Sequence, residues 1–194
     1  GDLETERLIV TAGPWASRLL PVLNPHIAIA RQTVGYFQLA GSPEQFQPGA
    51  FPVWGYLLGK GDLGYYGLPQ FGRDGIKLAK HIITGVDDDP DDVPSQTPED
   101  AIEDLHVFLR EQFIPPIERF VTWETCLYTN TATEDFILDT HPDNANVTIG
   151  AGFSGHGFKF GPLTGRILSE LSLHGKTTLP EFEEARHLFA INQE

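Results

Sequence analysis

The sequence predicts an α+β fold in which a large mixed or antiparallel sheet, with helices on one side, lies between two strand–helix units. An apolar run and a helical pattern open the chain over residues 7–23, and a long stretch rich in aromatic and β-branched residues follows. A strand, a glycine-rich loop and a helix close it over residues 147–175. Single opening and closing units cannot complete a doubly wound parallel sheet, which needs several strands covered on both faces. We therefore expect a middle domain inserted into a second fold, part of which this sequence lacks.

The opening unit is predicted to be a buried strand followed by a short helix. Residues Arg7–Gly13 read RLIVTAG, an apolar run of branched residues ending in glycine that is typical of a parallel strand. Pro14 suits the first turn of a helix over Trp15–Leu23, because that position needs no N–H donor. Pro25 then disfavours further helix.

The middle of the chain alternates predicted strands with turn signals, and connections this short favour antiparallel pairing. The predicted strands are Ile27–Ala40, Val53–Leu58, Gly64–Leu68, Ile76–Ile83, Phe120–Asn130, Phe136–Asp139 and Val147–Ala151.

One amphipathic helix is predicted within this middle stretch. It starts at Thr97-Pro98-Glu99-Asp100 and ends before Pro115-Pro116. The acidic run Asp87–Asp92 precedes it, lacks EF-hand spacing and is predicted to be a solvated loop. The apolar face of the helix carries Ile102, Leu105, Leu109 and Phe113.

The closing unit, Val147–Gly175, contains a loop with five glycines between Gly150 and Gly161. Glycines let the backbone adopt positive φ and let a ligand approach closely. The helix that follows begins next to His156 and Lys159, so its free N–H groups and the lysine favour an electron-rich ligand. Its predicted apolar face is Leu163, Ile167, Leu168, Leu171 and Leu173, with Gly175 as the C-terminal cap.

Composition narrows the class of protein. The 194 residues carry 27 acidic and 13 basic side chains, a formal charge of -14 that disfavours nucleic acid or an anionic membrane as partner. We find no apolar run of the roughly 20 residues that span a bilayer and no signal-peptide pattern, so we expect a soluble, cytoplasmic protein. The single cysteine, Cys126, excludes an internal disulfide, and composition alone favours a buried core thiol.

Four blocks in order resemble the C-terminal part of the monomeric sarcosine oxidase family, FAD-dependent oxidoreductases of the D-amino-acid-oxidase-like superfamily. The blocks are LIVTAGPWASRLL, YYGLPQFGRDGIKLAKH, CLYTNTATEDFILDTHP and GAGFSGHGFKF. The family's dinucleotide fingerprint, a strand followed by GxGxxG and a ribose-binding acid, is absent here. The resemblance therefore implies a fragment or one piece of a split enzyme, whose partner is a missing N-terminal FAD-binding segment.

The resemblance also implies a division of the chain into functional parts. Residues 1–25 would be a strand–helix remnant of an FAD-binding α/β domain, and residues 26–146 the substrate and catalytic domain. Residues 147–180 would return to the FAD-binding domain, and residues 181–194 would form a C-terminal tail.

The implied activity is oxidation of the C–N bond of sarcosine or another N-methyl or secondary amino acid, with oxygen as acceptor and hydrogen peroxide as product. Two alternatives stay open. A related flavoprotein oxidase could act on N-methyltryptophan, pipecolate or glycated amino acids, or the isolated chain could be a catalytically silent fragment without FAD. We expect the isolated chain to lack FAD and activity, because the pyrophosphate and adenine contacts belong to the fingerprint region.

By resemblance, Cys126 would carry FAD covalently through a thioether in the complete protein. Lys77 would promote reduction of oxygen, and His81, four residues later on the same strand face, would lie near the substrate. Lys159 would pair with the substrate carboxylate. The implied cofactor-binding residues are Cys126, Gly152, Gly155, His156, Gly157 and Lys159, the catalytic ones Lys77, His81 and Lys159, and the substrate-binding ones Tyr66, Tyr128, His81 and Lys159.

Two further types of site were weighed against this one. Asp139 and His141 alternate on a strand and His156 follows, but ligands at that spacing are weak evidence for zinc or iron, and we predict no metal. Ser154 in GFSGH lacks the strand context and acidic partner of a hydrolase nucleophile. The arginine with which the family clamps the substrate carboxylate falls in the segment that would precede this chain.

Overall fold

The computed structural model describes residues 1–59, 63–82, 89–92, 94–113 and 115–192. They form two compact units. The sheet unit comprises residues 31–82 and 91–126, and the flanking unit comprises residues 1–30, 83–90 and 127–194. Two long strands, β2 (Ala28–Leu39) and β6 (Ile117–Asn130), run from one unit into the other. The predicted α+β class with a large antiparallel sheet is confirmed.

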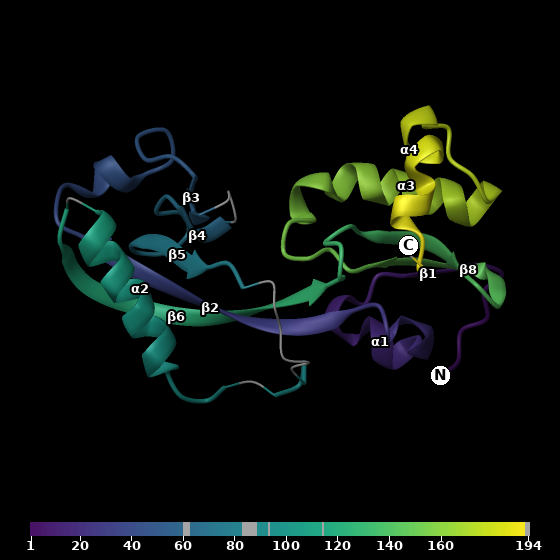
Figure 1. The fold of residues 1–194 in the computed structure, drawn as a ribbon, viewed down its shortest axis with the longest axis horizontal. Coiled ribbons are helices and arrows are strands. Elements are labelled where there is room, and N and C mark those ends of the chain that lie inside the picture. Colours follow the sequence, from purple (N-terminus) through teal and green to yellow (C-terminus); the bar gives the residue numbers. More distant parts are fainter. Residues whose placement is uncertain (60–62, 83–88, 93, 114, 193–194) are drawn as a thin grey trace. The chain divides into compact units, whose positions relative to one another are not determined.

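The sheet unit is built on five strands in the order β3-β4-β5-β2-β6. β3 (Trp54–Leu57), β4 (Leu63–Leu68) and β5 (Ile76–Lys80) pair antiparallel with one another, and β5 pairs antiparallel with β2. The register places Tyr36 opposite Lys77 and Phe37 opposite Ile76. Helix α2 (Glu99–Gln112) lies across one face of this sheet (Figure 1).

The core of the sheet unit lies between that face and α2. Residues directly opposite each other in a sheet share a face, so one face receives Phe37 with Ile76. Three predicted apolar positions of the helix, Ile102, Leu105 and Leu109, are buried there, and Phe113 packs beside them just after the helix ends. The full set of buried side chains is Phe37, Leu39, Phe46, Ile76, Leu78, Ile102, Leu105, Phe108 and Leu109.

The flanking unit contains a smaller sheet in the order β1-β8-β7. β1 (Leu8–Val10) pairs parallel with β8 (Asn144–Ala151), so the opening strand is of the predicted parallel type, and β7 (Ile137–His141) pairs antiparallel with β8. Helix α3 (Gly161–His174) and helix α4 (Pro180–Ala185) follow. Their buried side chains join those of the sheet in one cluster: Phe136, Leu138, Ile167, Leu168, Leu171 and Phe182.

Gly175 ends α3 as predicted. Its φ of 70° is left-handed, a conformation that glycine adopts without steric cost, and its N–H donates to the Leu171 carbonyl over 2.8 Å. Two predicted members of the apolar face, Leu163 and Leu173, are instead exposed, while Ile167, Leu168 and Leu171 are buried.

The opening unit differs from its prediction in two respects. The predicted helix over Trp15–Leu23 is divided into a 3₁₀ turn, α1 (Ala16–Leu19) and a second 3₁₀ turn that begins at Pro21. Pro21 has no N–H with which to continue the helical ladder. The strand Leu8–Val10 was predicted to be buried, yet Leu8 is 47% exposed and Ile9 40%, and Val10 is buried.

Several element ends also differ from the predicted ones. β5 ends at Lys80, before His81, and the last predicted residue of that strand, Ile83, lies outside the described residues. So do Asp87 and Asp88 of the predicted solvated loop. Within the described part of the chain, no helix combines the length and apolar character required to cross a membrane.

Glu170 ties the last turns of α3 to the segment that follows. Its carboxylate accepts hydrogen bonds from Arg166 Nε over 2.8 Å, from the Thr178 N–H over 2.5 Å and from Thr178 Oγ1 over 3.0 Å. These donors, Arg166 first, lower the pKa of Glu170 to about 2. All three favour the ionised carboxylate, so protonation at low pH weakens this connection.

We predict that Glu170→Gln removes a stabilisation that depends on pH. Because the pKa of Glu170 is lower in the folded chain, its contribution is present above about pH 4.5 and is lost as pH falls towards 2. Thermal unfolding between pH 2 and pH 7 should show the largest difference between the variant and the parent at pH 7. Glu184→Gln, at an exposed carboxylate on α4, is the control. A Glu170→Gln difference that stays constant with pH would contradict the assignment.

Candidate functional site

The predicted site residues fall in both units, and each unit is described by itself. In the sheet unit they lie on the side of the sheet turned away from α2. Lys77 is opposite Tyr36 in the register, and Tyr66 is opposite Ala79 on the same side. We call this side the Cys126 face and define it by Tyr36, Tyr66, Lys77, Glu124 and Cys126.

Lys77 and Lys80 occupy opposite sides of β5. Lys80 lies on the α2 side, where its Nζ is 3.3 Å from Asp104 Oδ2 and 5.5 Å from the centre of the Tyr65 ring. Lys77, three residues earlier, is half-buried on the Cys126 face. The alternation of strand side chains thus separates a lysine held by an α2 carboxylate from one that faces away from the helix.

His81 follows directly after β5. Its N–H donates to the Gly64 carbonyl over 2.9 Å, and its ring meets Tyr66 edge-on, with 6.4 Å between ring centres. Two of the predicted substrate-binding side chains, Tyr66 and His81, are therefore neighbours. Tyr65 points the other way and stacks on Phe108 of α2 at 4.0 Å.

Cys126 lies on β6 with an exposed side chain. The prediction of a buried core thiol, which composition alone favoured, is therefore wrong for this chain. Two residues earlier on the same side of the strand, Glu124 accepts a hydrogen bond from Tyr36 Oη over 2.9 Å and forms an ion pair with Arg73. An exposed thiol beside fixed charges can react with an electron-poor partner, because the thiolate is the nucleophile.

Sequence reasoning missed Tyr36, Arg73 and Glu124. They come from three separate segments that the pairing of β2 with both β5 and β6 brings together, and the one local signal was a charged residue two positions before the cysteine in WETC. Burial, followed by the hydrogen bond to Glu124, raises the pKa of Tyr36 to about 12. The phenol therefore stays protonated at neutral pH and remains a hydrogen-bond donor.

In the flanking unit, the glycine loop follows β8 and is held from within. Gly152, Ser154 and Gly155 have positive φ values of 65°, 47° and 76°. Ser154 is fully buried. Its backbone N–H donates to the Thr129 carbonyl over 2.9 Å, and its side-chain Oγ donates to the Gly152 carbonyl over 3.2 Å. Ser154 Oγ also accepts from the Thr131 N–H over 3.3 Å, so this hydroxyl holds the loop shape.

Tyr128 lies directly beneath the loop. A Cβ at Gly155 would fall 2.3 Å from the Tyr128 ring, and one at Gly157 would fall 2.5 Å from Phe153. Both distances are too short for any side chain, so these glycines allow the backbone to lie on aromatic rings. Tyr128, predicted to line the substrate pocket, is buried against the loop.

His156 and Lys159 stand on the far part of the loop. His156 Nε2 is 3.1 Å from the Glu134 carbonyl, which can only accept, so Nε2 carries the proton. Lys159 is exposed, with Nζ 5.1 Å from the centre of the Phe160 ring, in the 3₁₀ turn Phe158–Phe160 that leads into α3. The first turn of α3 has no acidic side chain and no side-chain cap, so its N–H groups and Lys159 favour an anionic group.

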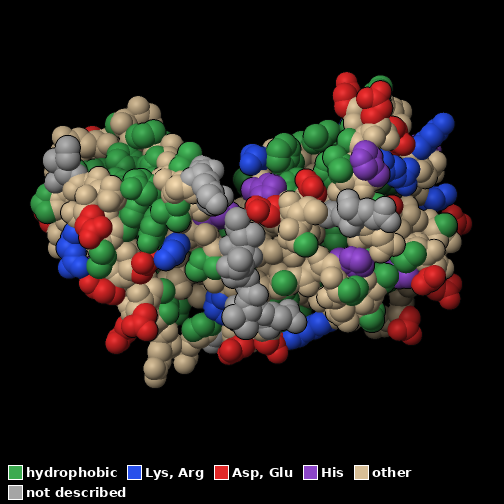
Figure 2. Space-filling model, viewed as in Figure 1, with side chains coloured by type: hydrophobic (Ala, Val, Ile, Leu, Met, Phe, Trp, Pro, Cys, Tyr) green, Lys and Arg blue, Asp and Glu red, His purple; other side chains and the backbone are tan. Residues whose placement is uncertain are grey.

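A cavity of about 490 Å³ adjoins this loop within the flanking unit. Its lining is mostly apolar and includes Phe136, His156, Phe160 and Leu163. Figure 2 shows hydrophobic side chains gathered at the surface over the N-terminal part of α3.

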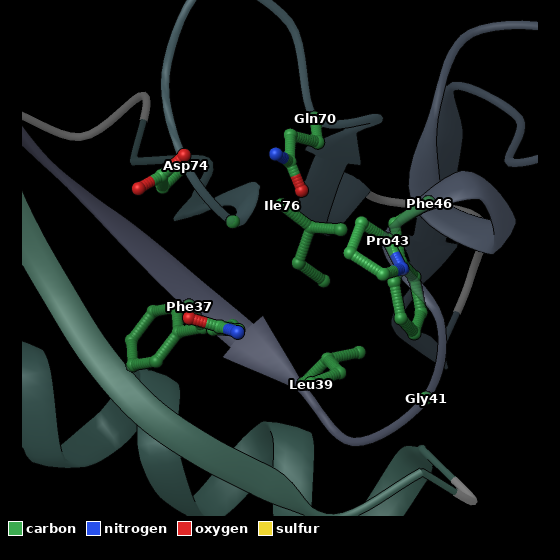
Figure 3. Close-up of a pocket in the computed structure, with 10 residues that line it drawn as sticks. Phe37, Leu39, Gly41, Pro43, Phe46, Gln70, Asp74 and Ile76 are labelled. Atoms are coloured by element: carbon green, nitrogen blue, oxygen red, sulfur yellow. The ribbon is translucent and has the colours of Figure 1, made fainter.

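A second cavity of about 120 Å³ lies in the sheet unit, at the end of β2 (Figure 3). Gln70 and Asp74 bring polar side chains to one side of it, while Phe37, Leu39 and Phe46 face it from the others. It contains none of the residues predicted to bind cofactor or substrate.

Asp139 and His141, the residues weighed as metal ligands in the sequence, have other contacts. The Asp139 carboxylate accepts from the N–H groups of Thr140 and Ile191, and His141 Nδ1 accepts from the Asp143 N–H over 3.1 Å. Among the described residues, no group of three or more His, Cys, Asp or Glu side chains could hold a metal ion.

A family model described as FAD dependent oxidoreductase matches residues 1–171. The chain belongs to the FAD dependent oxidoreductase family. The resemblance found in the four sequence blocks is thereby confirmed.

Curated proteins that are similar in sequence include sarcosine oxidases. Monomeric sarcosine oxidase of Bacillus sp. (strain B-0618) is 38% identical across 100% of this chain, which covers 48% of that protein. Peroxisomal sarcosine oxidase of Homo sapiens is 38% identical, with 88% of this chain and 44% of that protein covered. N-methyl-L-tryptophan oxidase of Escherichia coli is 33% identical, with 91% of this chain and 46% of that protein covered. The chain spans about half the length of the curated relatives it matches.

Solved structures of two oxidases share the fold. Fructosamine oxidase of Aspergillus fumigatus (Amadoriase II) has a TM-score of 0.72 and 21% identity, covering 99% of this chain and 46% of that one. Iminodiacetate oxidase of Chelativorans sp. BNC1 has a TM-score of 0.64 and 20% identity, and the match covers 94% of this chain and 46% of that one. At these identities the likeness concerns the fold alone.

We predict that Gly155→Ala destabilises the loop, because the new Cβ meets the Tyr128 ring at 2.3 Å and the backbone keeps a φ of 76°. Overpacking and backbone strain together should cost about 2–4 kcal/mol in the free energy of unfolding. Gly165→Ala is the matched control, since Gly165 is an exposed helical residue of α3 with open space around it. That control should gain roughly 0.5–1 kcal/mol. Denaturant unfolding of both variants checks this, and equal stabilities would refute it.

Proposed function

We propose that this chain is the substrate-facing half of an FAD-dependent oxidase that oxidises the C–N bond of an N-methyl or other secondary amino acid, sarcosine first. Oxygen would be the electron acceptor and hydrogen peroxide the product. The observation that carries this proposal is the Cys126 face, where Lys77, Tyr66 and an exposed thiol lie on one side of the five-stranded sheet. The identity of 38% to a sarcosine oxidase over the whole chain supports the substrate class.

The residues present fit the ring part of FAD. An exposed thiol suits attachment to the ring. The sequence holds no dinucleotide fingerprint for the pyrophosphate and adenine, so we propose that a separate FAD-binding segment supplies those contacts. When bound, FAD would supply the two-electron chemistry.

The chain's own side chains would then bind substrate and place charge. Lys159, exposed before an α3 N-terminus without acidic side chains, would attract the substrate carboxylate. Tyr66 and His81, in edge-on contact, would form one wall of the substrate site. His156, whose Nε2 is engaged by the Glu134 carbonyl, would present Nδ1 rather than exchange a proton through Nε2.

Lys77 would act on oxygen. A fixed cation stabilises the negative charge that develops when oxygen accepts an electron. Lys77 lies on the Cys126 face, whereas the Lys80 charge is compensated by Asp104 on the opposite side. The two lysines therefore offer a comparison within one strand.

A second substrate class is favoured by the comparisons. One relative, 33% identical, is named for N-methyl-L-tryptophan, which is therefore a competing substrate. Pipecolate and glycated amino acids remain the other amines to be tested. The other alternative is a catalytically silent chain, which its length relative to the sarcosine oxidases supports.

Oxygen uptake across an amine panel tests the function. The chain is expressed alone and together with a polypeptide that supplies the other half of the family fold, and both are tested with sarcosine, N-methyltryptophan, pipecolate and a glycated amino acid. We expect yellow protein, oxygen uptake and equimolar peroxide with sarcosine for the pair, and neither flavin absorbance nor uptake for the chain alone. Faster turnover of another amine would change the substrate, and a colourless, inactive pair would favour the silent alternative.

We predict that Lys77→Met in the active pair slows reoxidation of the reduced flavin by oxygen on the order of 100-fold. Reduction by the amine should change far less, because the cation acts on oxygen. Stopped-flow absorbance separates the two half-reactions. Lys80→Met, on the same strand but facing Asp104, should leave both rates close to the parent values. Equal slowing of both half-reactions by Lys77→Met would count against the assignment.

A further inference from the structure

The cavity of about 490 Å³ beside the glycine loop is walled mainly by aromatic rings. Phe136 and Phe160 meet edge-on with 5.6 Å between ring centres, and Phe182 and Phe189 lie 5.4 Å apart. All four rings line the cavity, which lies wholly within the flanking unit. Its volume is in the range of small-molecule sites. The walls therefore suit a ligand with an apolar body.

The polar side chains in the wall of this cavity are hydrogen-bond acceptors. Asp135 and Glu181 contribute carboxylates. His156 donates its Nε2 proton to the Glu134 carbonyl, which leaves Nδ1 as an acceptor. The hydroxyl proton of Thr164 is engaged by two backbone carbonyls of the preceding turn, each 3.1 Å away, so its oxygen can only accept from a ligand. A ligand that fits these groups is a hydrogen-bond donor.

Cations and backbone donors are scarce in the same wall. Among the described residues that line the cavity there is no lysine or arginine, and Lys159 of the loop does not line it. At the start of α3, the Gly161 N–H donates to the Phe158 carbonyl, and Pro162 has no N–H. The two carboxylates therefore have no cation among the residues of the wall itself.

We propose that this cavity binds a protonated amine that carries an aromatic group. The cation is attracted both by the carboxylates and by the faces of the phenylalanine rings, and its N–H groups donate to the acceptors of the wall. An anionic ligand would be repelled by Asp135 and Glu181. The inference does not depend on the proposed oxidation, because no residue of the Cys126 face lines the cavity.

Three probes of similar shape and different charge test the ligand class on the 194-residue chain. At about pH 8, 2-phenylethylamine is a cation, 2-phenylethanol is neutral and 3-phenylpropanoate is an anion. Titrations followed by amide chemical shifts should show the amine binding roughly fivefold to twentyfold more tightly than the alcohol, and the propanoate binding most weakly. The shifted amides should be those around Phe136, Leu163 and Phe182. No binding of the amine, equal affinities, or tightest binding of the propanoate would overturn the proposal.

Carboxylate variants separate charge from packing. Asp135→Asn and Glu181→Gln together keep the shape of the wall and remove its charge. The affinity for 2-phenylethylamine should fall to about that for 2-phenylethanol, which should itself change by less than about twofold. Glu184→Gln, at an exposed carboxylate of α4 that does not line the cavity, is the matched control and should change neither affinity. Equal weakening of amine and alcohol by the double variant would contradict the role of charge.

Leu163→Trp tests the location of the site. Leu163 is 46% exposed on α3 and lines the cavity, so a larger ring there should occupy its mouth and weaken binding of amine and alcohol by about fivefold. Leu173→Trp is the matched control, because Leu173 is 58% exposed on the same helix and does not line the cavity. Equal affinities of the two variants would place the ligand elsewhere and overturn the assignment.

The same titration in the pair with the FAD-binding half distinguishes a ligand site from a surface that the other polypeptide covers. Retained binding of 2-phenylethylamine, with the same dependence on Asp135 and Glu181, supports the proposal. Binding to the chain alone and not to the pair would show that the polypeptide is the occupant, and the proposal would fail. Oxygen uptake plays no part in this readout, so failure of the proposed oxidase activity is distinguishable from failure of this site.

Discussion

Strand alternation is the constraint on which the sheet unit depends. Consecutive side chains of β2 must leave opposite faces, so Phe37 enters the core beneath α2 while Tyr36 contacts Glu124 on the other side. The same rule sends Lys80 to Asp104 and Lys77 to the Cys126 face. A shift of one residue in the β2–β5 register would exchange the two sets, placing charged groups against α2 and apolar rings beside the thiol. The hydrophobic core therefore fixes the position of the chemical groups.

The shape of the glycine loop depends on a different constraint, which is the lack of space for side chains between its backbone and the aromatic rings beneath it. Tyr128 and Phe153 occupy the space into which side chains at residues 155 and 157 would project. The backbone is held from the other side by the Ser154 hydroxyl, which is fully buried and hydrogen-bonded to Gly152 and Thr131. A loop fixed on both sides holds its N–H groups in one arrangement. Binding of a ligand to them therefore does not carry the entropic cost of ordering the loop. Ser154 is structural here, in agreement with the sequence argument against a nucleophile.

Much of the fold could be predicted from sequence because its signals are local. Alternation and turn residues located the strands, and the apolar spacing of residues 102–109 located α2. Failures arose where tertiary context decides. Pro21 interrupts a helix that the apolar spacing alone would have continued. Ile9 is exposed in an edge strand, although the apolar, branched residues of that strand are typical of a buried one. The roles assigned to Lys77, His81, Cys126 and Lys159 came from family motifs and stay predictions. The contact of Arg73 with Glu124 joins residues 51 positions apart, so no local pattern could reveal it.

The edge position of β1 has a practical consequence. β1 stands at one end of the strand order β1-β8-β7, so among the described residues its outer backbone groups lack a neighbouring strand, and Leu8 and Ile9 are exposed beside them. Edges of this kind accept strands from other molecules. The chain handled by itself should therefore self-associate as its concentration rises, despite a charge of -14 that opposes close approach. Added salt would screen that repulsion, so dilute solutions of low ionic strength should keep the chain monomeric.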